Sequence, residues 1–313
     1  MKWGFLGYGR IARKFEESLR FGNEEIHAIA SRSQYDRIPK EYVKYKDYSS
    51  LLNDHEIDIV YVSTTHNTHA KHAIDALNSG KHVLCEKPLA ISPDEVEEMF
   101  EASEKNDRFL MEAIWSRYLP GYQKAISMIK EGAIGDVQFI SAHFGFRMNP
   151  DQPKERLIDP DLAAGAIWDV GIYPISLVQD IFEDDPQDIQ VHAKLSSRGV
   201  EDRCSVMMSY DNSRFAQFSC GIDLGTINKA LITGTAGTVE MDDFWKCEKF
   251  TITNDGGTRS YSVPMSSTGL IHEAVACRKM IEQGMTSSPL ITRHHSLQLS
   301  KIMEEVIYLA RKS

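Results

Sequence analysis

The stretch "KWGFLGYGRIA", residues 2–12, decides the fold of the first part of the chain. An apolar strand pattern runs into the spacing G-x-G-x-x-A, which is formed by Gly7, Gly9 and Ala12. In such a turn the first glycine permits a tight bend, the second lets the backbone approach a pyrophosphate, and the small third residue lets helix and strand pack closely. The motif predicts a dinucleotide-binding turn, and a tight βα turn without a ligand is the alternative interpretation.

The helix that follows favours the first interpretation. A helical pattern over 10–21 starts directly after Gly9, so Arg10 and Ile11 stand at its N-terminus. Backbone N–H groups at a helix N-terminus point at a bound anion, and the helix dipole favours negative charge there. We therefore expect these two residues, together with the glycines, to hold the phosphates of the cofactor.

Strand and helix patterns alternate over the first third of the chain. The helix over 92–106 opens with a capping box of Ser92 and Glu95, and Pro93 takes the first helical position. This alternation predicts an α/β fold with a doubly wound parallel sheet. The expected strands are 2–7, 25–31, 58–64, 81–86 and 108–114, and the expected helices are 10–21, 69–80 and 92–106.

The pattern changes after Pro120. A helix is expected over 122–135, and closely spaced strand patterns follow, with turn signals such as "YDNS" and "GTAG" between them. They predict a large, mostly antiparallel open sheet with further helices, and domains of residues 1–118 and 119–313. The expected strands are 137–146, 189–196, 203–210, 214–222, 228–234, 237–241, 248–253 and 259–263, and the expected helices are 166–182, 269–283 and 294–311.

Composition excludes several classes of protein. The chain has 313 residues, of which 42% are hydrophobic and 26% charged, as in soluble globular proteins of more than one domain. A net charge of −10 argues against a general binder of nucleic acid or of anionic membranes. No secretory signal opens the sequence, and no apolar run approaches the roughly 20 residues of a membrane-spanning helix. The five scattered cysteines indicate reduced thiols in a cytoplasmic protein.

The end of the second strand bears on the choice of cofactor. NAD-binding sites usually carry Asp or Glu there, which bonds the ribose hydroxyls. This chain offers Ser31 and Arg32 instead, and its first acid is Asp36. A guanidinium and hydroxyl groups bind the 2′-phosphate that a carboxylate would repel. The pattern favours NADP over NAD as cofactor, with a solvated surface arginine as the alternative.

The loop after the strand at 58–64 offers further cofactor ligands. Loops at the carboxyl ends of strands line the ligand crevice of a doubly wound sheet, so Thr64, Thr65 and Asn67 are candidates to hold the ribose and nicotinamide. Three histidines nearby lack a carboxylate or cysteine to complete a ligand set, so we expect no metal site. A packing role is favoured for His69 and His72.

The stretch "CEKPLA", residues 85–90, follows another strand of the same sheet. Lys87 is thereby expected at the carboxyl end of the sheet, where its ammonium group can bond a substrate hydroxyl and stabilise negative charge. Glu86 can pair with a cation and fix the turn, and the Lys87–Pro88 peptide bond is a candidate for the cis form. A turn with a solvated lysine is the alternative for this stretch taken alone.

A second reactive cluster is expected in "AAGAIWDVGIYPI", residues 163–175. Asp169 and Tyr173 are four residues apart and share a face if the segment is helical, and Gly171 between them allows close approach. A tyrosine serves as a general acid or base once a cation lowers its pKa from about 10, and Lys87 would be that cation. The alternative is a helix start with a favourably placed Asp and a core Tyr.

These motifs together resemble the Gfo/Idh/MocA oxidoreductases. The resemblance rests on "GYGRIA", "GKHVLCEKPLA" at 80–90, "MEAIWSRYLP" at 111–120 and "GAIWDVGIYPI" at 165–175, and it extends over essentially the whole chain. The third motif is similar to the branch that contains dimeric dihydrodiol dehydrogenase and NADP-dependent D-xylose dehydrogenase. The resemblance implies an N-terminal Rossmann domain and a C-terminal α/β domain whose open sheet forms the homo-oligomer interface.

The resemblance also implies roles for single residues. Lys87 is implied as the catalytic lysine, and Asp169 and Tyr173 as its catalytic partners; many relatives carry His in place of this tyrosine. An aromatic wall around the substrate is matched well by Trp115 and more loosely by two other aromatic residues, Phe144 and Trp245, which could equally be core residues. Arg117 is a candidate for a structural ion pair.

The expected reaction is hydride transfer between the nicotinamide of NADP or NAD and the C–OH group of a sugar, polyol or dihydrodiol, in either direction. Tyr173, assisted by Lys87, would take the hydroxyl proton, and Asp169 would orient the hydroxyl or the lysine. Two alternatives are an NAD-dependent glycoside hydrolase, against which the Ser31–Arg32 turn speaks, and a silent dinucleotide-binding sensor, which would be expected to lose the lysine or the tyrosine.

Overall fold

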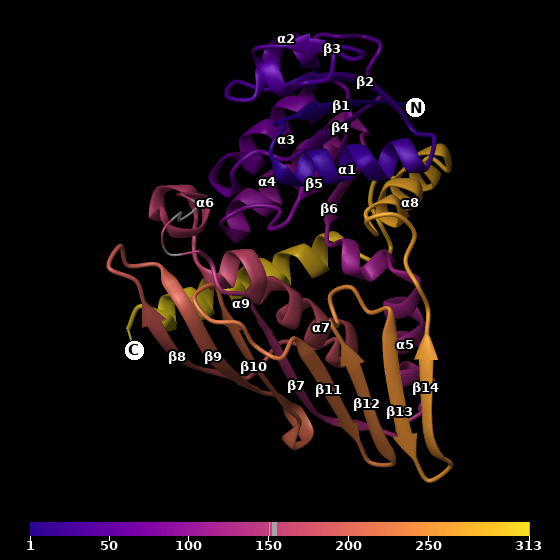
Figure 1. The fold of residues 1–313 in the computed structure, drawn as a ribbon, viewed down its shortest axis with the longest axis vertical. Helices are drawn as coiled ribbons and strands as arrows, with labels where there is room; N and C mark the ends of the chain where they lie inside the picture. Colours follow the sequence, from indigo (N-terminus) through magenta and orange to yellow (C-terminus); the bar gives the residue numbers. More distant parts are fainter. Residues whose placement is uncertain (150, 152–154, 313) are drawn as a thin grey trace. The chain divides into compact units, whose positions relative to one another are not determined.

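The chain folds into two compact units in the computed structural model of Figure 1, which describes residues 1–149, 151 and 155–312. The first unit comprises Met1–Trp115 and Ser266–Leu297, and the second comprises Ser116–Met265 and Gln298–Ser313. The predicted domains, 1–118 and 119–313, depart from this division, because a segment near the end of the chain returns to the first unit.

The returning segment carries a helix that completes the first unit. This helix, α8 (Ile271–Glu282), packs against α1 (Arg10–Phe21). The two approach so closely that a Cβ atom at Gly22 would lie 2.3 Å from Cδ1 of Ile271. The helix pattern was predicted at 269–283, but no local pattern indicates which of two sheets a helix will cover.

Six parallel strands form the sheet of the first unit, in the order β3-β2-β1-β4-β5-β6. This order reverses direction between β1 and β4, as in the doubly wound arrangement that the sequence predicted, and ligands bind at the carboxyl ends of strands beside such a reversal. The strands are β1 (Lys2–Leu6), β2 (Glu25–Ala30), β3 (Val43–Tyr45), β4 (Ile59–Val62), β5 (His82–Glu86) and β6 (Leu110–Ala113).

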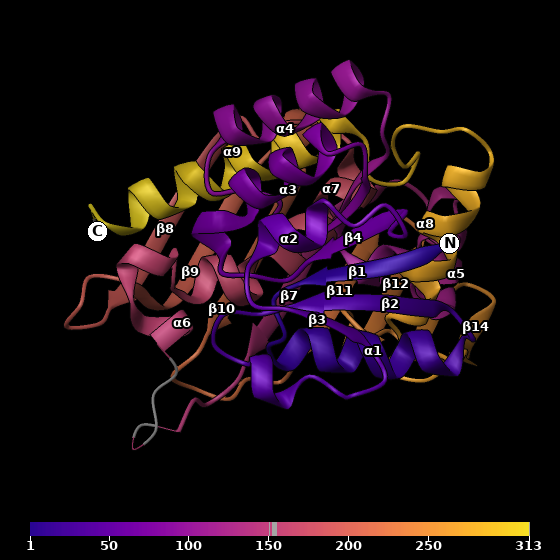
Figure 2. The same cartoon turned by 90° about the horizontal axis from the view of Figure 1, so that it is seen from above.

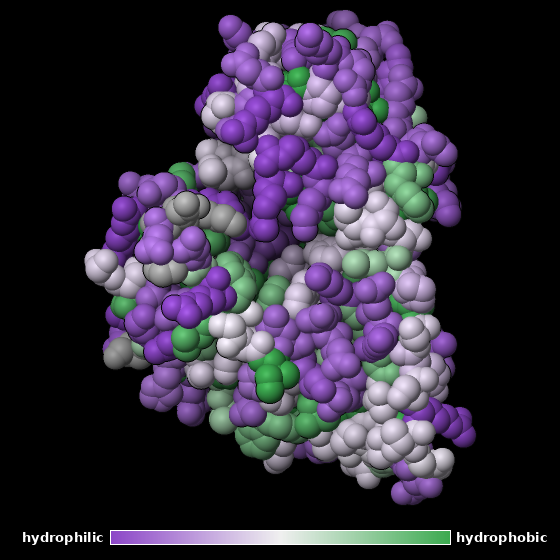
Figure 3. Space-filling view, viewed as in Figure 1, coloured by the Kyte–Doolittle hydropathy of each residue, from purple (hydrophilic) through white to green (hydrophobic). Residues whose placement is uncertain are grey.

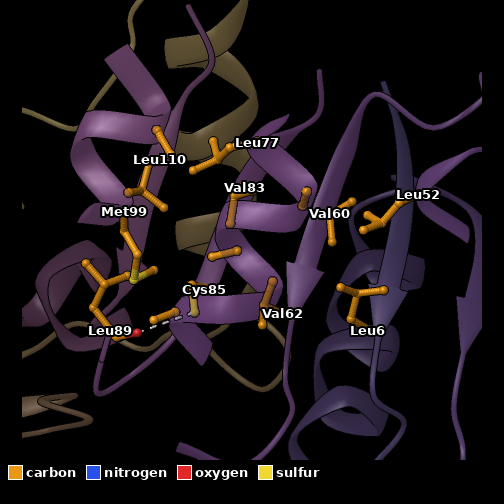
Figure 4. Close-up of a cluster of buried hydrophobic side chains, with 14 of the residues drawn as sticks. Leu6, Leu52, Val60, Val62, Leu77, Val83, Cys85, Leu89, Met99 and Leu110 are labelled. Carbon is orange, nitrogen blue, oxygen red and sulfur yellow. Dashed lines mark hydrogen bonds between the residues drawn. The ribbon is translucent and has the colours of Figure 1, made fainter. Parts of the chain in front are cut away.

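Helices cover both faces of this sheet. Figure 2 shows α1 on one side of the strands and α3 and α4 on the other. Leu6, Val60, Val62 and Val83 project from the strands into a buried cluster with residues of those two helices (Figure 4). Besides α1 and α8, the helical segments of this unit are η1 (Tyr35–Arg37), α2 (Tyr48–Leu52), η2 (His66–Thr68), α3 (His69–Asn78) and α4 (Pro93–Asn106).

The predicted capping box is present at the start of α4. Ser92 Oγ accepts a hydrogen bond from the backbone N–H of Glu95 at 3.2 Å, and the Glu95 carboxylate accepts one from the N–H of Ile91 at 3.1 Å. The first bond satisfies a donor that the helix start would otherwise leave without a partner, and the second fixes the residue that precedes the N-cap.

The second unit is built on an eight-stranded sheet in the order β14-β13-β12-β11-β7-β10-β9-β8. Only β7 and β10 are parallel neighbours, so the predicted mostly antiparallel sheet is confirmed. The strands are β7 (Val137–Gly145), β8 (Asp188–Leu195), β9 (Glu201–Ser209), β10 (Phe215–Gly221), β11 (Lys229–Gly234), β12 (Gly237–Asp242), β13 (Lys249–Asn254) and β14 (Gly257–Ser262).

One face of this sheet is covered by helices, among them α5 and α7. The alternation in β9 follows from this, since Val206 and Met208 are buried and Met207 between them is exposed. The helical segments are η3 (Trp115–Tyr118), which begins at the unit boundary, α5 (Pro120–Lys130), α6 (Glu155–Ile158), η4 (Pro160–Leu162), η5 (Ile167–Gly171), α7 (Ile172–Phe182), η6 (Asp211–Ser213) and α9 (Arg293–Ala310), which starts in the first unit.

One helical stretch of the described chain, Pro160–Phe182, is long and apolar enough to cross a membrane by length and composition. No such stretch was expected from the sequence. In the structure 78% of its most apolar window is buried inside the protein, which is also the property of a core helix. We therefore interpret this stretch as the central helix of the second unit.

Candidate active site

The glycine turn after β1 has the geometry that the sequence predicted. Gly7 has a φ of +94°, and a Cβ atom there would lie 2.8 Å from the carbonyl oxygen of Ser63, so a side chain is excluded. A Cβ at Gly9 would meet nothing within 4 Å, which leaves the backbone open to a ligand. No side chain caps α1, so the N–H groups of its first turn, at Arg10 and Ile11, suit a pyrophosphate.

Ser31 and Arg32, which the sequence assigned together to the cofactor phosphate, lie in different environments at the end of β2. Ser31 is 2% exposed, and its Oγ accepts a hydrogen bond from the N–H of Gln34 at 3.1 Å, so its hydroxyl already stabilises the turn. Arg32 is exposed, and its guanidinium carbon lies 4.7 Å from the ring centroid of Tyr48. Of the two, Arg32 is the residue that a ligand can reach.

The loop after β4 holds Thr64, Thr65 and Asn67 at the carboxyl end of the sheet, as predicted. Thr65 Oγ1 donates to Asn67 Oδ1 at 2.8 Å, and Thr64 Oγ1 lies 3.2 Å from Nδ1 of His72. Thr65 and Asn67 thus order each other, and His72 orders Thr64, at the edge where β4 neighbours β1. This is where a doubly wound sheet binds its ligand.

The turn after β5 is held by buried polar groups. Tyr61 donates to the carboxylate of Glu86, and the N–H of Leu89 donates to Glu112 Oε1 at 2.9 Å. The peptide bond between Lys87 and Pro88 is cis, which confirms the hypothesis from the sequence. Lys87 therefore extends from a turn whose neighbours on both sides are fixed.

His69 belongs to the same turn. Its Nδ1 lies 2.7 Å from the carbonyl oxygen of Pro88 and its Nε2 lies 3.4 Å from that of Thr64. Burial lowers the pKa of His69 to about 4, so the ring is neutral at neutral pH and donates one N–H, which the shorter contact assigns to Nδ1. The predicted packing role is confirmed, and the residue also ties the β4 loop to the β5 turn.

The second unit carries Asp169 in the π-helical turn η5 and Tyr173 at the start of α7. The Asp169 carboxylate pairs with the guanidinium of Arg156 at 2.8 Å. Gly171 lies against the buried sheet, since a Cβ there would come within 3.3 Å of Cys220 Sγ. The predicted close approach at this glycine is therefore to the protein's own strand β10.

Aromatic side chains surround Tyr173 within the second unit. The Phe144 ring centroid lies 5.5 Å from that of Tyr173, and Trp245 stacks on Phe144 at 3.8 Å and 13°. Phe144 is 8% and Trp245 9% exposed, so both are largely buried, and Phe144 lies between Trp245 and the candidate acid–base residue in this chain of ring contacts. The structure thus brings together two of the three predicted substrate residues, while Trp115 lies at the end of the first unit.

Arg117 has the structural role that the sequence proposed for it. Its buried guanidinium lies 3.0 Å from Asp180 and donates to Ser176 Oγ at 3.1 Å. Both partners lie on α7, so the arginine fixes the helix that begins with Tyr173.

Sequence reasoning missed three residues that support the site. Arg156 pairs with Asp169 and Tyr61 with Glu86, while Glu112 holds the backbone of Leu89 in the turn that carries Lys87. No motif spacing points to Arg156 or Tyr61. Glu112 stands inside the quoted motif "MEAIWSRYLP", which was the single available signal. Among the described residues no three His, Cys, Asp or Glu side chains cluster as a metal site requires.

Comparison with known proteins identifies the family. Residues 1–114 match the oxidoreductase family model with an NAD-binding Rossmann fold, and residues 122–240 match the Gfo/Idh/MocA C-terminal domain. The trans-1,2-dihydrobenzene-1,2-diol dehydrogenase of Xenopus laevis is 32% identical over 98% of this chain and 97% of that protein. The chain belongs to the Gfo/Idh/MocA oxidoreductase family. The human protein of the same name is 29% identical over 98% of this chain and 96% of its own length.

Solved structures confirm the fold. The aldose-aldose oxidoreductase of Caulobacter crescentus, complexed with glycerol, has a TM-score of 0.88 at 22% identity and covers 100% of this chain and 98% of its own. KijD10, a 3-ketoreductase of Actinomadura kijaniata in complex with NADP and TDP-benzene, has a TM-score of 0.87 at 22% identity, covering 98% and 96%. Family membership makes the chain an NAD(P)-dependent oxidoreductase, as the sequence predicted.

Proposed function

We propose that this protein transfers a hydride between NADP and the C–OH group of a sugar, polyol or dihydrodiol. The observation that carries the proposal is the fixed turn that presents Lys87 at the carboxyl end of β5, in a chain that also has Asp169 in η5 and Tyr173 at the start of α7. The names of relatives, a dihydrodiol dehydrogenase and an aldose-aldose oxidoreductase, support an alcohol or carbonyl substrate.

Charge at the end of β2 supports NADP as the preferred cofactor. Residues 31–46 contain five Lys or Arg and two Asp or Glu, a local charge of +3 in a chain of net charge −10. Arg32 is exposed there, and the first acid after β2 is Asp36. A 2′-phosphate would be attracted to this segment. NAD lacks this phosphate, so the arginine would not strengthen its binding in the same way.

The proposed mechanism gives each of the three catalytic residues one task. Tyr173 takes the proton of the substrate hydroxyl, and the Lys87 ammonium group stabilises the resulting oxygen charge. Asp169, held in place by Arg156, orients the hydroxyl. The cofactor, when bound, supplies the hydride acceptor or donor.

The aromatic residues next to Tyr173 support a ring-shaped substrate. Phe144 and Trp245 form a stacked pair, and aromatic faces bind both sugar rings and the flat faces of cyclic dienes through apolar contact. We assign the two residues, with Trp115, to the substrate side of the reaction.

We further propose that the protein is a homo-oligomer that uses the outer face of the eight-stranded sheet. Leu231, Ser141, Gln217 and Met207 are aligned across β11, β7, β10 and β9. Met207 and Leu231 are 46% and 38% exposed, and green hydrophobic residues are visible over the lower part of Figure 3. A second copy would cover these side chains.

Five free, buried cysteines support a reducing, cytoplasmic location.

Reduction of the cofactor tests the function directly. Purified protein with NADP⁺ and a panel of aldoses, polyols and dihydrodiols is expected to produce the reduced-nicotinamide absorbance band with at least one compound. With NAD⁺ the same compound should give kcat/KM at least about tenfold lower, because one or two charge-assisted hydrogen bonds are lost. Equal rates with both cofactors would contradict the NADP preference. The substrate class would be contradicted if no compound of the panel were oxidised with NADP⁺ and no corresponding carbonyl compound were reduced with NADPH.

A further inference from the structure

The Arg32 guanidinium stacks on an aromatic ring. Its guanidinium carbon lies 4.7 Å from the ring centroid of Tyr48, and it makes no hydrogen bond or ion pair with any residue in the described part of the chain. Guanidinium groups stack on aromatic faces while their N–H groups stay available at the edge. The stacked arrangement therefore restricts the side chain without using its donors.

Tyr48 is itself held firmly. It is the first residue of α2, and this helix is capped by Asp47, whose Oδ1 accepts a hydrogen bond from the N–H of Ser50 at 2.8 Å. The Tyr48 ring also packs against the buried cluster of the first unit. An exposed arginine thus rests on a ring whose backbone and side chain are both fixed.

His72 also contacts the ring of Tyr48. The His72 ring meets the Tyr48 ring edge to face, with centroids 4.7 Å apart and an interplanar angle of 83°. The pKa of His72 is lowered to about 4, mainly by burial and secondly by the charge of Arg32. The ring is therefore neutral at physiological pH and does not repel the guanidinium. Tyr48, His72 and Thr64 thereby form a contiguous support from Arg32 to the loop after β4.

We propose that Tyr48 is a specificity-determining residue, whose ring holds the Arg32 guanidinium ready to bind the 2′-phosphate of NADP. This inference rests on the proposed NADP preference. A free arginine side chain would have to be ordered when the phosphate binds, and ordering a long side chain weakens binding. Tyr48 removes part of this cost before the ligand arrives, and it gives NAD no advantage.

Binding of cofactor fragments tests the proposal without turnover. Isothermal titration calorimetry would measure the Kd of 2′,5′-ADP and of 5′-AMP for the full chain. We expect the wild type to prefer 2′,5′-ADP by about tenfold or more. Tyr48→Leu should weaken 2′,5′-ADP binding about 3- to 10-fold and change 5′-AMP binding less than about twofold. Tyr48→Phe keeps the ring and should retain the preference of the wild type.

A double-mutant cycle separates this role from general packing. In an Arg32→Met background, Tyr48→Leu should cause no further loss of 2′,5′-ADP affinity, since the tyrosine acts through the arginine. If Tyr48→Leu does not fold, Arg32→Lys replaces it, because lysine keeps the charge and loses the planar stack. Arg32→Lys should then weaken 2′,5′-ADP binding selectively.

Three results would overturn the inference. Equal losses for both fragments in Tyr48→Leu, or additive losses in the double mutant, would make the tyrosine a packing residue only. An unchanged preference in Tyr48→Leu would show that the stack is irrelevant to the phosphate. A wild type that does not distinguish the fragments would overturn the NADP preference itself, and this inference with it.

Discussion

Glu273 carries a carboxyl group in a buried environment that disfavours its charged form. It is fully buried on α8, and neither of its oxygens has a hydrogen-bond partner among the described residues. Burial, and next the nearby charge of Glu86, raise its pKa well above the usual value of 4.5. The folded protein therefore holds a proton on this residue at pH values where the unfolded chain has released it.

Replacing Glu273 should stabilise the protein as pH rises. Because the folded-state pKa is raised, the wild type loses stability above about pH 4.5, at up to about 1.4 kcal/mol per pH unit until the folded state also ionises. Glu273→Gln removes this titration, so its free energy of unfolding relative to wild type should increase from pH 5 to pH 8 in urea denaturation. Glu282→Gln, on the exposed part of the same helix, is the control and should show no such trend. A constant difference between Glu273→Gln and wild type across this range would contradict the assignment.

The sequence predicted residues whose role is set by the backbone and missed those whose role depends on packing. Gly7 and Lys87 follow strands at fixed offsets, so their positions could be inferred from the motif alone. Ser31 was predicted to bind a phosphate, but its hydroxyl is engaged by Gln34 in the turn. Tyr48 stacks on Arg32 from 16 residues away (48 − 32 = 16), and no periodicity signals such a contact.

At the scale of elements, strand alternation was the most informative pattern. All eight strands of the second sheet were predicted close to their observed bounds, because one face of that sheet is buried and the other is not. The short segments β3 and α2 were missed, since three to five residues are too few to show a period. The helix predicted over 122–135 runs from Pro120 to Lys130, so its C-terminal end was placed five residues too late.

The outer face of the eight-stranded sheet should be sensitive to charge. If a second copy covers it, Met207→Lys combined with Leu231→Lys places two unpaired charges in the interface and should produce monomers in light scattering after size exclusion. Phe21→Lys, at an even more exposed apolar residue of the first unit, is the control and should leave the oligomer intact. An unchanged oligomer in the double variant, or a monomeric wild type, would contradict the proposed interface.

At the scale of the whole molecule, the division of the chain into units escaped prediction. Local patterns located the helix at 269–283 correctly, but its packing on α1 depends on contacts between residues some 250 positions apart, such as Ser18 with Thr268. Family membership, in contrast, was evident from the sequence, because four motifs spread over the chain specify it jointly. The fold class could thus be predicted from the sequence, but the assignment of Ser266–Leu297 to the first unit could not.

The central claim is that Lys87 and Tyr173, carried by different units, act on one substrate hydroxyl. The most direct test is the turnover of Tyr173→Phe and Lys87→Met on a compound that the wild type oxidises, with the NADPH dissociation constant measured in parallel by fluorescence. We expect kcat to fall at least about 100-fold in each variant, as for loss of a general acid–base group, while NADPH binding by Tyr173→Phe changes less than about threefold. Wild-type turnover in either variant would contradict it.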